Sequence, residues 1–283
     1  AAKAGRPDDK TKWLLGDGPG LPDFERSPAR HKPVRTAFPE GGYYILGSDY
    51  GTDNEIRMIM DAGPLGYLSI AAHGHADALA LVLSVGGEEI LIDPGTYAYH
   101  TQKRWRDYFR GTVAHNTVCV DGLDQSVSGG NFMWLRHART SAVSWQENED
   151  GARLSAQHDG YGRLPDGVLH ARSVRFERQL RRFVIEDQLT CKAGHEVQRF
   201  WHFGESCRVE DDANGVTVRS GAKTVRLILD SPSPAARNLY RGSEQPLSGW
   251  VSRRFDVKQP TVTLVESCRI SSTATLRAVI ECK

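Results

Sequence analysis

Near its middle the chain reads Ser173-Val-Arg-Phe-Glu-Arg-Gln-Leu-Arg-Arg-Phe-Val-Ile-Glu-Asp-Gln-Leu-Thr190, in which apolar and charged side chains largely alternate. Because successive side chains of a β-strand point to opposite faces, the pattern predicts two amphipathic strands with arginine and glutamate facing outward. Comparable runs follow at intervals suited to antiparallel pairing, at 197–203, 215–219, 223–229, 261–266 and 274–280. We therefore predict an all-β fold, a large antiparallel β-sandwich.

The start of the chain has a different texture. Residues 1–40 contain many prolines and glycines and little periodicity, so we predict a short irregular lead-in or linker there. Strands are expected at 43–46, 56–61, 68–72, 78–85, 89–92 and 116–120. Since no long amphipathic helix is evident after residue 40, residues 41–283 are predicted to form the sandwich domain.

The overall composition excludes a general attraction to polyanions. Lys and Arg total 36 against 35 Asp and Glu, a formal net charge of +1, so an anionic partner must be bound by a local cluster. We expect no nucleic-acid partner, because the net charge is close to zero. We expect no membrane span, because apolar runs such as 78–85 are far too short to cross a bilayer. The five cysteines contain no CxxC pair, which argues against a disulfide framework and a cysteine zinc site but leaves one bridge open.

Two histidines stand close together in His73-Gly-His75. On a β-strand the i, i+2 spacing places both imidazoles on one face, and the small neighbouring residues leave room around them. Two imidazoles and a carboxylate form a suitable ligand set for Zn²⁺, although the spacing could serve several metals. We assign His75, Asp93 and His115 to the metal and leave His73 to face the cleft.

Each of these residues also has an ordinary interpretation. A single histidine is more often a surface or hydrogen-bonded core residue, and Asp93 begins an Asp-Pro-Gly sequence that favours a turn. Their combination in one segment shifts the balance toward a site. Asp77 is close enough in the sequence to orient a ligand histidine by accepting its second ring proton.

The segment 97–110 alternates aromatic rings with guanidinium groups, including Tyr99 and Arg110. Rings can stack on sugar faces, and arginine binds carboxylate or sulfate with two hydrogen bonds. The segment therefore suits an acidic sugar; the alternative is a solvated surface helix or loop. Trp134 packs the sandwich edge or lines a sugar groove, and the sequence leaves both interpretations open.

Several of these motifs together resemble the C-terminal β-sandwich region of the heparinase II/III-like polysaccharide lyases. The matching text comprises Ala37–Tyr44, Asp61–Gly66, His73–Asp77, Asp93–Tyr97, Tyr108–Arg110, Ala114–Val118 and Val120–Gly122, with Asp124 and Gln125. The likeness is close over roughly 36–135. In the later strands only the general pattern of the sequence is similar.

The resemblance implies β-elimination of a uronic-acid-containing glycan, with a metal, usually zinc, held at positions matching His75, Asp93 and His115. It implies a cleft-facing catalytic histidine at His73, as acid/base or charge-neutralising group, and we expect Tyr99 and Arg110 to contact substrate. It also implies an acidic polysaccharide or oligosaccharide as partner, a periplasmic or secreted location, and an N-terminal helical toroid domain that is missing from this chain.

Two other classes stay open at this point. A two-histidine, one-carboxylate set is also typical of a cupin-like metal-dependent enzyme, which predicts iron or manganese with open coordination positions. If the chain is a non-catalytic carbohydrate-binding sandwich, we expect its glycan affinity to be unchanged by His73→Ala.

Overall fold

A computed structural model describes residues 34–231 and 234–283. The compact unit begins at Thr36 and ends at Lys283. Residues 36–40, which the sequence analysis placed in the lead-in, belong to this unit because Ala37 and Phe38 pair with Tyr44 and Tyr43. The predicted lead-in up to residue 33 lies outside the described residues.

Three antiparallel sheets make up most of the unit. The first has the order β1 (Ala37–Phe38), β2 (Tyr43–Ser48), β3 (Ile56–Asp61), β4 (Leu81–Val85), β5 (Glu88–Leu91). The second has the order β14 (Arg208–Asp212), β15 (Gly215–Ser220), β16 (Lys223–Asp230), β23 (Ala274–Cys282), β12 (Arg182–Thr190), β11 (Leu169–Glu177), β10 (Gly151–His158), β9 (Thr140–Asn148). The third has the order β17 (Ala236–Arg241), β22 (Val262–Ile270), β13 (His195–His202), β6 (Val118–Val120).

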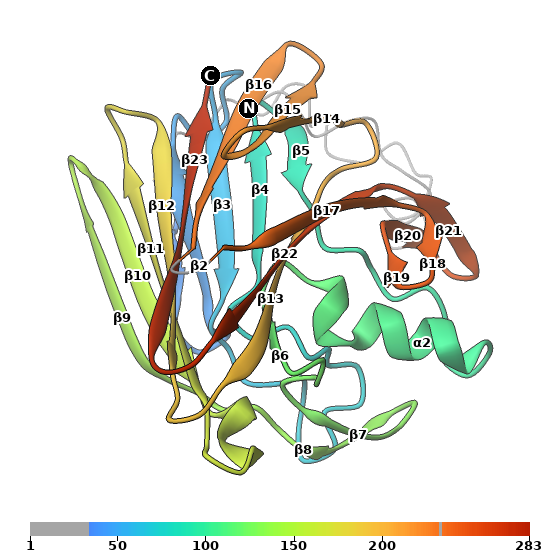
Figure 1. Cartoon of the computed structure of the whole chain (residues 1–283). Helices are drawn as coiled ribbons and strands as arrows, with labels where there is room; N and C mark the ends of the chain where they lie inside the picture. The colour runs from blue at the N-terminus through green and yellow to red at the C-terminus, as the bar shows by residue number, and fades with distance from the viewer. Residues whose placement is uncertain (1–33, 232–233) are drawn as a thin grey trace, which may run out of the picture. The chain divides into compact units, whose positions relative to one another are not determined.

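Three hairpins and short helices complete the fold. The hairpins are β7 (Val127–Gly130) with β8 (Met133–Arg136), β18 (Ser243–Glu244) with β19 (Leu247–Ser248), and β20 (Trp250–Arg254) with β21 (Val257–Pro260). The helices are α2 (Lys103–Arg110) and the 3₁₀ turns η1 (Thr112–Ala114) and η2 (Gly160–Arg163). In Figure 1, β9–β12 lie at the left and α2 at the right, outside the sheets.

The predicted strand pair forms as the alternation indicates. Residues 173–190 supply most of β11 and β12, in which Phe176 lies opposite Phe183 with ring centroids 4.8 Å apart. Both rings are buried in a core shared with Leu46 and Met58 of the first sheet. Burying a ring or a leucine of this size stabilises a fold by about 1.5–3 kcal/mol. The all-β sandwich is therefore confirmed, with the first and second sheets packed face to face.

The first and third sheets join edge to edge at the end of β13. The Ile92 amide donates to the His202 carbonyl at 2.9 Å, and the Gly204 amide donates to Ile90 at 3.2 Å. Val120 and Val197 of the third sheet share a second core cluster with Leu276 of the eight-stranded sheet. The first and third sheets therefore cover the same face of the second sheet.

The histidine pair does not lie on a strand. Residues 68–72 form turns, and β4 begins at Leu81 rather than at residue 78, so His73 and His75 lie in the loop between β3 and β4. A Cβ on Gly74 would lie 3.0 Å from the Gly66 backbone nitrogen. The small residues read as room around the imidazoles thus allow this loop to fold back on itself, which is why the strand prediction was wrong there.

The segment 97–110 ends in helix α2, which buries five of its eight residues and is therefore not the solvated surface helix that was the alternative to a sugar-binding segment. Trp105, Tyr108 and Phe109 are buried on one face, and Trp105 packs edge-on against Trp250 of β20 at 5.2 Å between ring centroids. Neither α2 nor any other helix in the described part is long and apolar enough to cross a membrane.

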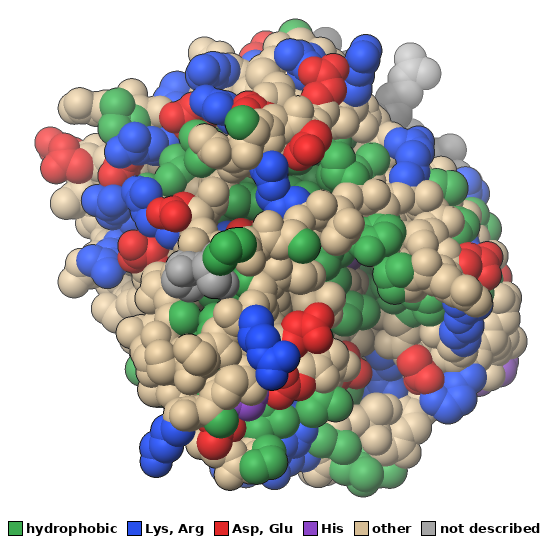
Figure 2. Space-filling view, viewed as in Figure 1, with side chains coloured by type: hydrophobic (Ala, Val, Ile, Leu, Met, Phe, Trp, Pro, Cys, Tyr) green, Lys and Arg blue, Asp and Glu red, His purple; other side chains and the backbone are tan. Residues whose placement is uncertain are grey.

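The remaining features of composition agree with the fold. All five cysteines are free and buried, so the bridge that the sequence left open does not form. Over the face in Figure 2, acidic and basic side chains are intermingled, as the near-neutral net charge indicates.

Asn116, which directly follows His115, joins three parts of the fold. Its amide Nδ2 donates to the carbonyls of Leu81 at 2.7 Å and Ile92 at 2.9 Å, and its Oδ1 accepts the His202 amide at 2.6 Å. The side chain is buried, 2% exposed. One amide thus ties the start of β4, the end of β5 and the end of β13.

We expect Asn116→Ala to lower the free energy of unfolding by about 3 kcal/mol, because two carbonyls and one amide lose their partner in a buried place. Chemical denaturation followed by circular dichroism measures this. Asn238→Ala, at an exposed position of β17, is the control and should stay within about 0.5 kcal/mol. Equal stability of the two variants would contradict the assigned role.

Candidate metal and catalytic site

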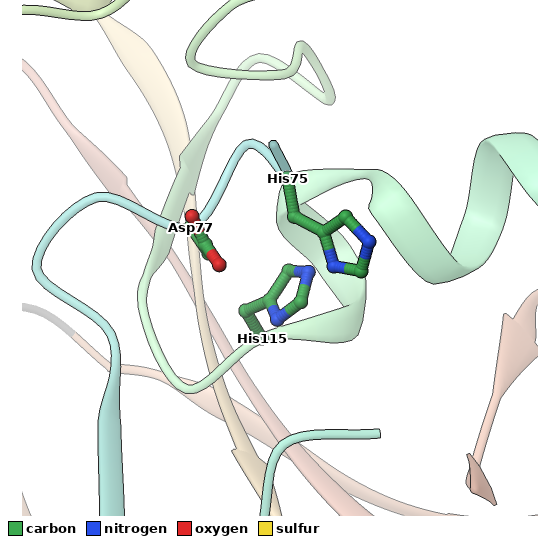
Figure 3. A group of neighbouring side chains, drawn as sticks. All are labelled: His75, Asp77 and His115. Carbon is green, nitrogen blue, oxygen red and sulfur yellow. The ribbon is translucent and has the colours of Figure 1, made fainter. Parts of the chain in front are cut away.

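His75, Asp77 and His115 bring ligand atoms within 4.8 Å of one another. His75 and Asp77 come from the β3–β4 loop, and His115 directly follows η1. Figure 3 shows the three side chains converging on one space, with Asp77 on one side and His75 on the other. The ring centroids of His75 and His115 are 5.2 Å apart. Segments distant in the sequence thus form one cluster of nitrogen and oxygen donors.

The protein environment shifts the pKa values of this cluster. Burial, reinforced by the neighbouring His115, lowers the pKa of His75 to about 3, so its imidazole is neutral at physiological pH. A neutral imidazole is the form that binds a metal ion. Burial raises the pKa of Asp77 to about 7 because the charged carboxylate has lost much of its solvation. A cation between these groups would offset that loss.

Asp93 contacts the same cluster from the end of β5. Its Oδ2 lies 3.0 Å from His115 Nδ1, and its Oδ1 accepts the Gly95 amide at 2.8 Å. Burial opposes the charged carboxylate, but His115 outweighs it and lowers the pKa of Asp93 to about 2. Half of the Asp93 side-chain surface is exposed, so solvent screens this pair. Gly95 has φ +83°, and a Cβ there would lie 2.1 Å from the Ser252 carbonyl oxygen, so glycine is required beside the carboxylate.

The donor set fits a zinc ion. Nε2 of His115 is buried without a hydrogen-bond partner among the described residues, and an unpaired buried nitrogen is costly unless a ligand satisfies it. Two imidazoles with a carboxylate oxygen match the ligands that zinc prefers. Of the predicted ligands, His75 and His115 lie in the three-residue group, in which the carboxylate is Asp77. Asp93 lies outside that group and contacts His115 Nδ1. The roles of the two carboxylates therefore stay predictions.

His73 lies apart from the donor cluster, in a group of aromatic rings. Its ring centroid is 5.4 Å from Tyr99 and 6.3 Å from Phe132, and its side chain is exposed. Tyr99 also contacts Phe255 at 4.7 Å between centroids. The i, i+2 spacing thus sends the two histidines to different places, His75 to the donors and His73 to an open aromatic surface. Tyr99 lies beside His73, where a substrate contact was predicted.

Arg110 is buried, contrary to the exposed position that a direct substrate contact suggests. Only 1% of the residue is exposed; its guanidinium lies 4.1 Å over the Trp134 ring and donates to the Gly130 carbonyl. Arg106, fully buried one helical turn earlier, donates to the Asn131 carbonyl. Both arginines thus hold the tip of hairpin β7–β8, and any substrate role of Arg110 stays a prediction.

Sequence reasoning missed how the hairpin shapes the site. Trp134 is buried, its indole Nε1 donates to the Gly74 carbonyl at 2.9 Å, and its amide donates to Ile70 at 3.1 Å. The ring therefore supports the backbone between His73 and His75. Phe132, which follows Gly129-Gly130-Asn131, is a residue that the sequence prediction did not include. An aromatic ring at a glycine-rich turn is the signal that could have indicated it.

Comparison with known proteins agrees with this architecture. A family model described as Heparinase II/III-like, C-terminal, matches residues 30–278. The chain is similar to the heparan sulfate lyase HepC from Pedobacter heparinus, with 18% identity and a TM-score of 0.72 over 96% of this chain and 39% of that one. A heparinase III structure gives 18% identity and a TM-score of 0.70 over 97% of this chain and 39% of its own. No curated protein sequence matches.

The fold and the match define a heparinase II/III-like C-terminal type of sandwich domain. The chain belongs to the heparinase II/III-like family, whose C-terminal region it matches along most of its length. It spans about 39% of the length of the solved structures named above. At 18% identity, these structures show the shared fold alone.

We expect His75→Ala and Asp93→Asn each to lower zinc affinity at least about 10-fold. A chelator should lower the melting temperature of the unchanged chain by roughly 5–10 °C, since an ion at 100 times its Kd stabilises by about 2.7 kcal/mol. Elemental analysis and thermal melting measure the two effects.

Asp77→Asn distinguishes the two carboxylates: a loss of zinc as large as that of Asp93→Asn would make Asp77 a ligand too. His100→Ala, at an exposed histidine, is the control. Melting that is the same with and without chelator would refute a bound structural metal.

Proposed function

We propose that this chain is the metal-binding sandwich part of a polysaccharide lyase that cleaves a uronic-acid-containing glycan by β-elimination. The observation that carries the proposal is an exposed His73 beside Tyr99, two residues from the donor His75, in a chain of the heparinase II/III-like family. Heparan sulfate, after which the similar heparan sulfate lyase HepC is named, is a glycan of this class.

The reaction requires two proton transfers. A base removes the C5 proton of the uronate, the C4–O bond breaks as a C4=C5 double bond forms, and an acid protonates the departing oxygen. Histidine and tyrosine suit these steps. We assign His73 to proton transfer or to neutralising the carboxylate, and Tyr99 to substrate contact. Donors around the carboxylate stabilise the enolate-like intermediate.

The metal supplies positive charge and rigidity when bound. His75, His115 and a carboxylate from Asp93 or Asp77 would hold it. This chain's own residues then keep the His73 loop in place, since His75 lies two residues from His73 on the same loop. We assign the ion a supporting role on these grounds.

The complete enzyme has further requirements. Because the similar structures are much longer than this chain, we propose that an N-terminal helical toroid domain completes the cleft and contributes the remaining catalytic groups. A periplasmic or secreted location follows from the substrate class, since long acidic glycans are met outside the cytoplasm.

A non-catalytic carbohydrate-binding domain is the second candidate. The exposed rings of Phe132 and Phe255, 40% and 58% exposed, suit sugar stacking without chemistry. The cupin-like alternative has lost its support, because the chain belongs to the heparinase II/III-like family.

We expect His73→Ala in the full-length parent protein to lower the rate of unsaturated-product formation by at least about 100-fold. Ultraviolet absorbance of the new double bond on heparan sulfate, alginate and other uronate glycans measures it. Melting temperature and zinc content should not change, because His73 lies outside the donor cluster, and His100→Ala should retain activity. Glycan binding without product from the unchanged parent over the whole panel would favour the non-catalytic candidate.

A further inference from the structure

A groove of about 1070 Å³ lies between the β3–β4 loop and strand β8. The loop contributes Pro64 to Ser69 on one side, and 134–140 line the other. No residue to which a metal or catalytic role has been assigned lines it. Trp134, which supports the backbone between His73 and His75, does line the groove.

The groove carries unpaired positive charge. Arg136 and Arg139 are exposed, and neither has an ion pair within residues 34–231 and 234–283. Asp159 is the single carboxylate among the lining residues, and its Oδ1 accepts the Arg139 amide at 2.8 Å. If His137 is counted as neutral, two guanidinium groups and one carboxylate give the groove lining a net charge of +1. Guanidinium groups pair with carboxylate or sulfate through two hydrogen bonds.

Apolar side chains stand open on both walls. Tyr67 is 79% exposed and Leu68 73% exposed on the loop, and Leu135 is 67% exposed on β8. Leu68 also has φ +57°, a left-handed conformation that costs a non-glycine residue roughly 1–2 kcal/mol. Exposed rings in strained loops are typical of binding sites. The combination of an open ring with free guanidinium groups suits a sugar chain that carries acidic groups.

The groove adjoins a small cavity beside the donor cluster. Leu65 and Ala138 line both the groove and a smaller cavity that also borders His75 and Asp77. Trp134, in the groove wall, donates to the Gly74 carbonyl between the two histidines. A chain lying in the groove would therefore pass beside the residues that position His73 and His75.

We propose that this groove binds consecutive units of an acidic glycan next to the cleavage site, with Arg136 and Arg139 pairing with its carboxylate or sulfate groups and Tyr67 stacking on a sugar ring. The inference rests on the proposed function for the identity of the glycan. Free guanidinium groups favour a polyanion over the apolar face of another protein domain.

The test is binding of heparan sulfate, alginate and uncharged dextran to this chain by calorimetry. We expect the double variant Arg136→Gln/Arg139→Gln to bind the two acidic glycans at least 10-fold more weakly, with a smaller dependence on salt. Tyr67→Ala should weaken binding several-fold, and dextran should bind at most weakly. Arg153→Gln, an exposed arginine on β10, is the matched control and should bind as the unchanged chain does.

Two further measurements separate the outcomes. Wild-type affinity of the double variant, or no acidic-glycan binding by the unchanged chain, overturns the proposal. A double variant that lowers the melting temperature of the full-length parent while leaving its KM for glycan unchanged makes the groove a domain interface and also overturns it. If binding depends on the two arginines but the parent forms no unsaturated product, glycan binding by the groove is supported and the proposed lyase function is contradicted.

Discussion

The buried side chain of Asn116 is the contact on which the site depends most. It joins the start of β4 to the ends of β5 and β13, because it donates to the Leu81 and Ile92 carbonyls and accepts the His202 amide. Its neighbour His115 enters the donor cluster, and Asp93 directly follows Ile92. The two functional side chains are therefore adjacent to atoms that this amide holds, so their separation is set by hydrogen bonds of fixed length rather than by flexible loops.

A buried arginine extends this constraint to the β3–β4 loop. Arg172 of β11 donates from Nη1 to the carbonyls of Leu79 at 2.6 Å and Asn116 at 2.7 Å, while Asp187 of β12 binds its other nitrogens. All of these side chains are nearly inaccessible. A buried ion pair often adds little net stability because both charges lose their hydration. Here the pair orients a guanidinium that ties the loop carrying His75 to the segment carrying His115.

The candidate site could be predicted in its chemistry but only partly in its geometry. The predicted donors His75 and His115 lie in one group with Asp77, and Asp93 contacts His115. Which carboxylate would bind a metal stays a prediction. The strand predicted for His73 and His75 was wrong, since they lie on a loop in which Gly74 packs closely against the Gly66 backbone. Arg110 was expected at the surface, yet Trp134, 24 positions later, covers its guanidinium. Contacts between such separated residues leave no local pattern in the chain.

By itself the sequence determined the β-sandwich and the residue types of the candidate site, because strand alternation and side-chain type are properties of neighbouring residues. The alternation of 173–190 was enough to place Phe176 and Phe183 in the core. Only the tertiary structure decided which arginines are buried, which carboxylate contacts His115, and where a charged groove opens. These depend on how strands far apart in the chain pack, and that packing is set by the whole core rather than by any one segment.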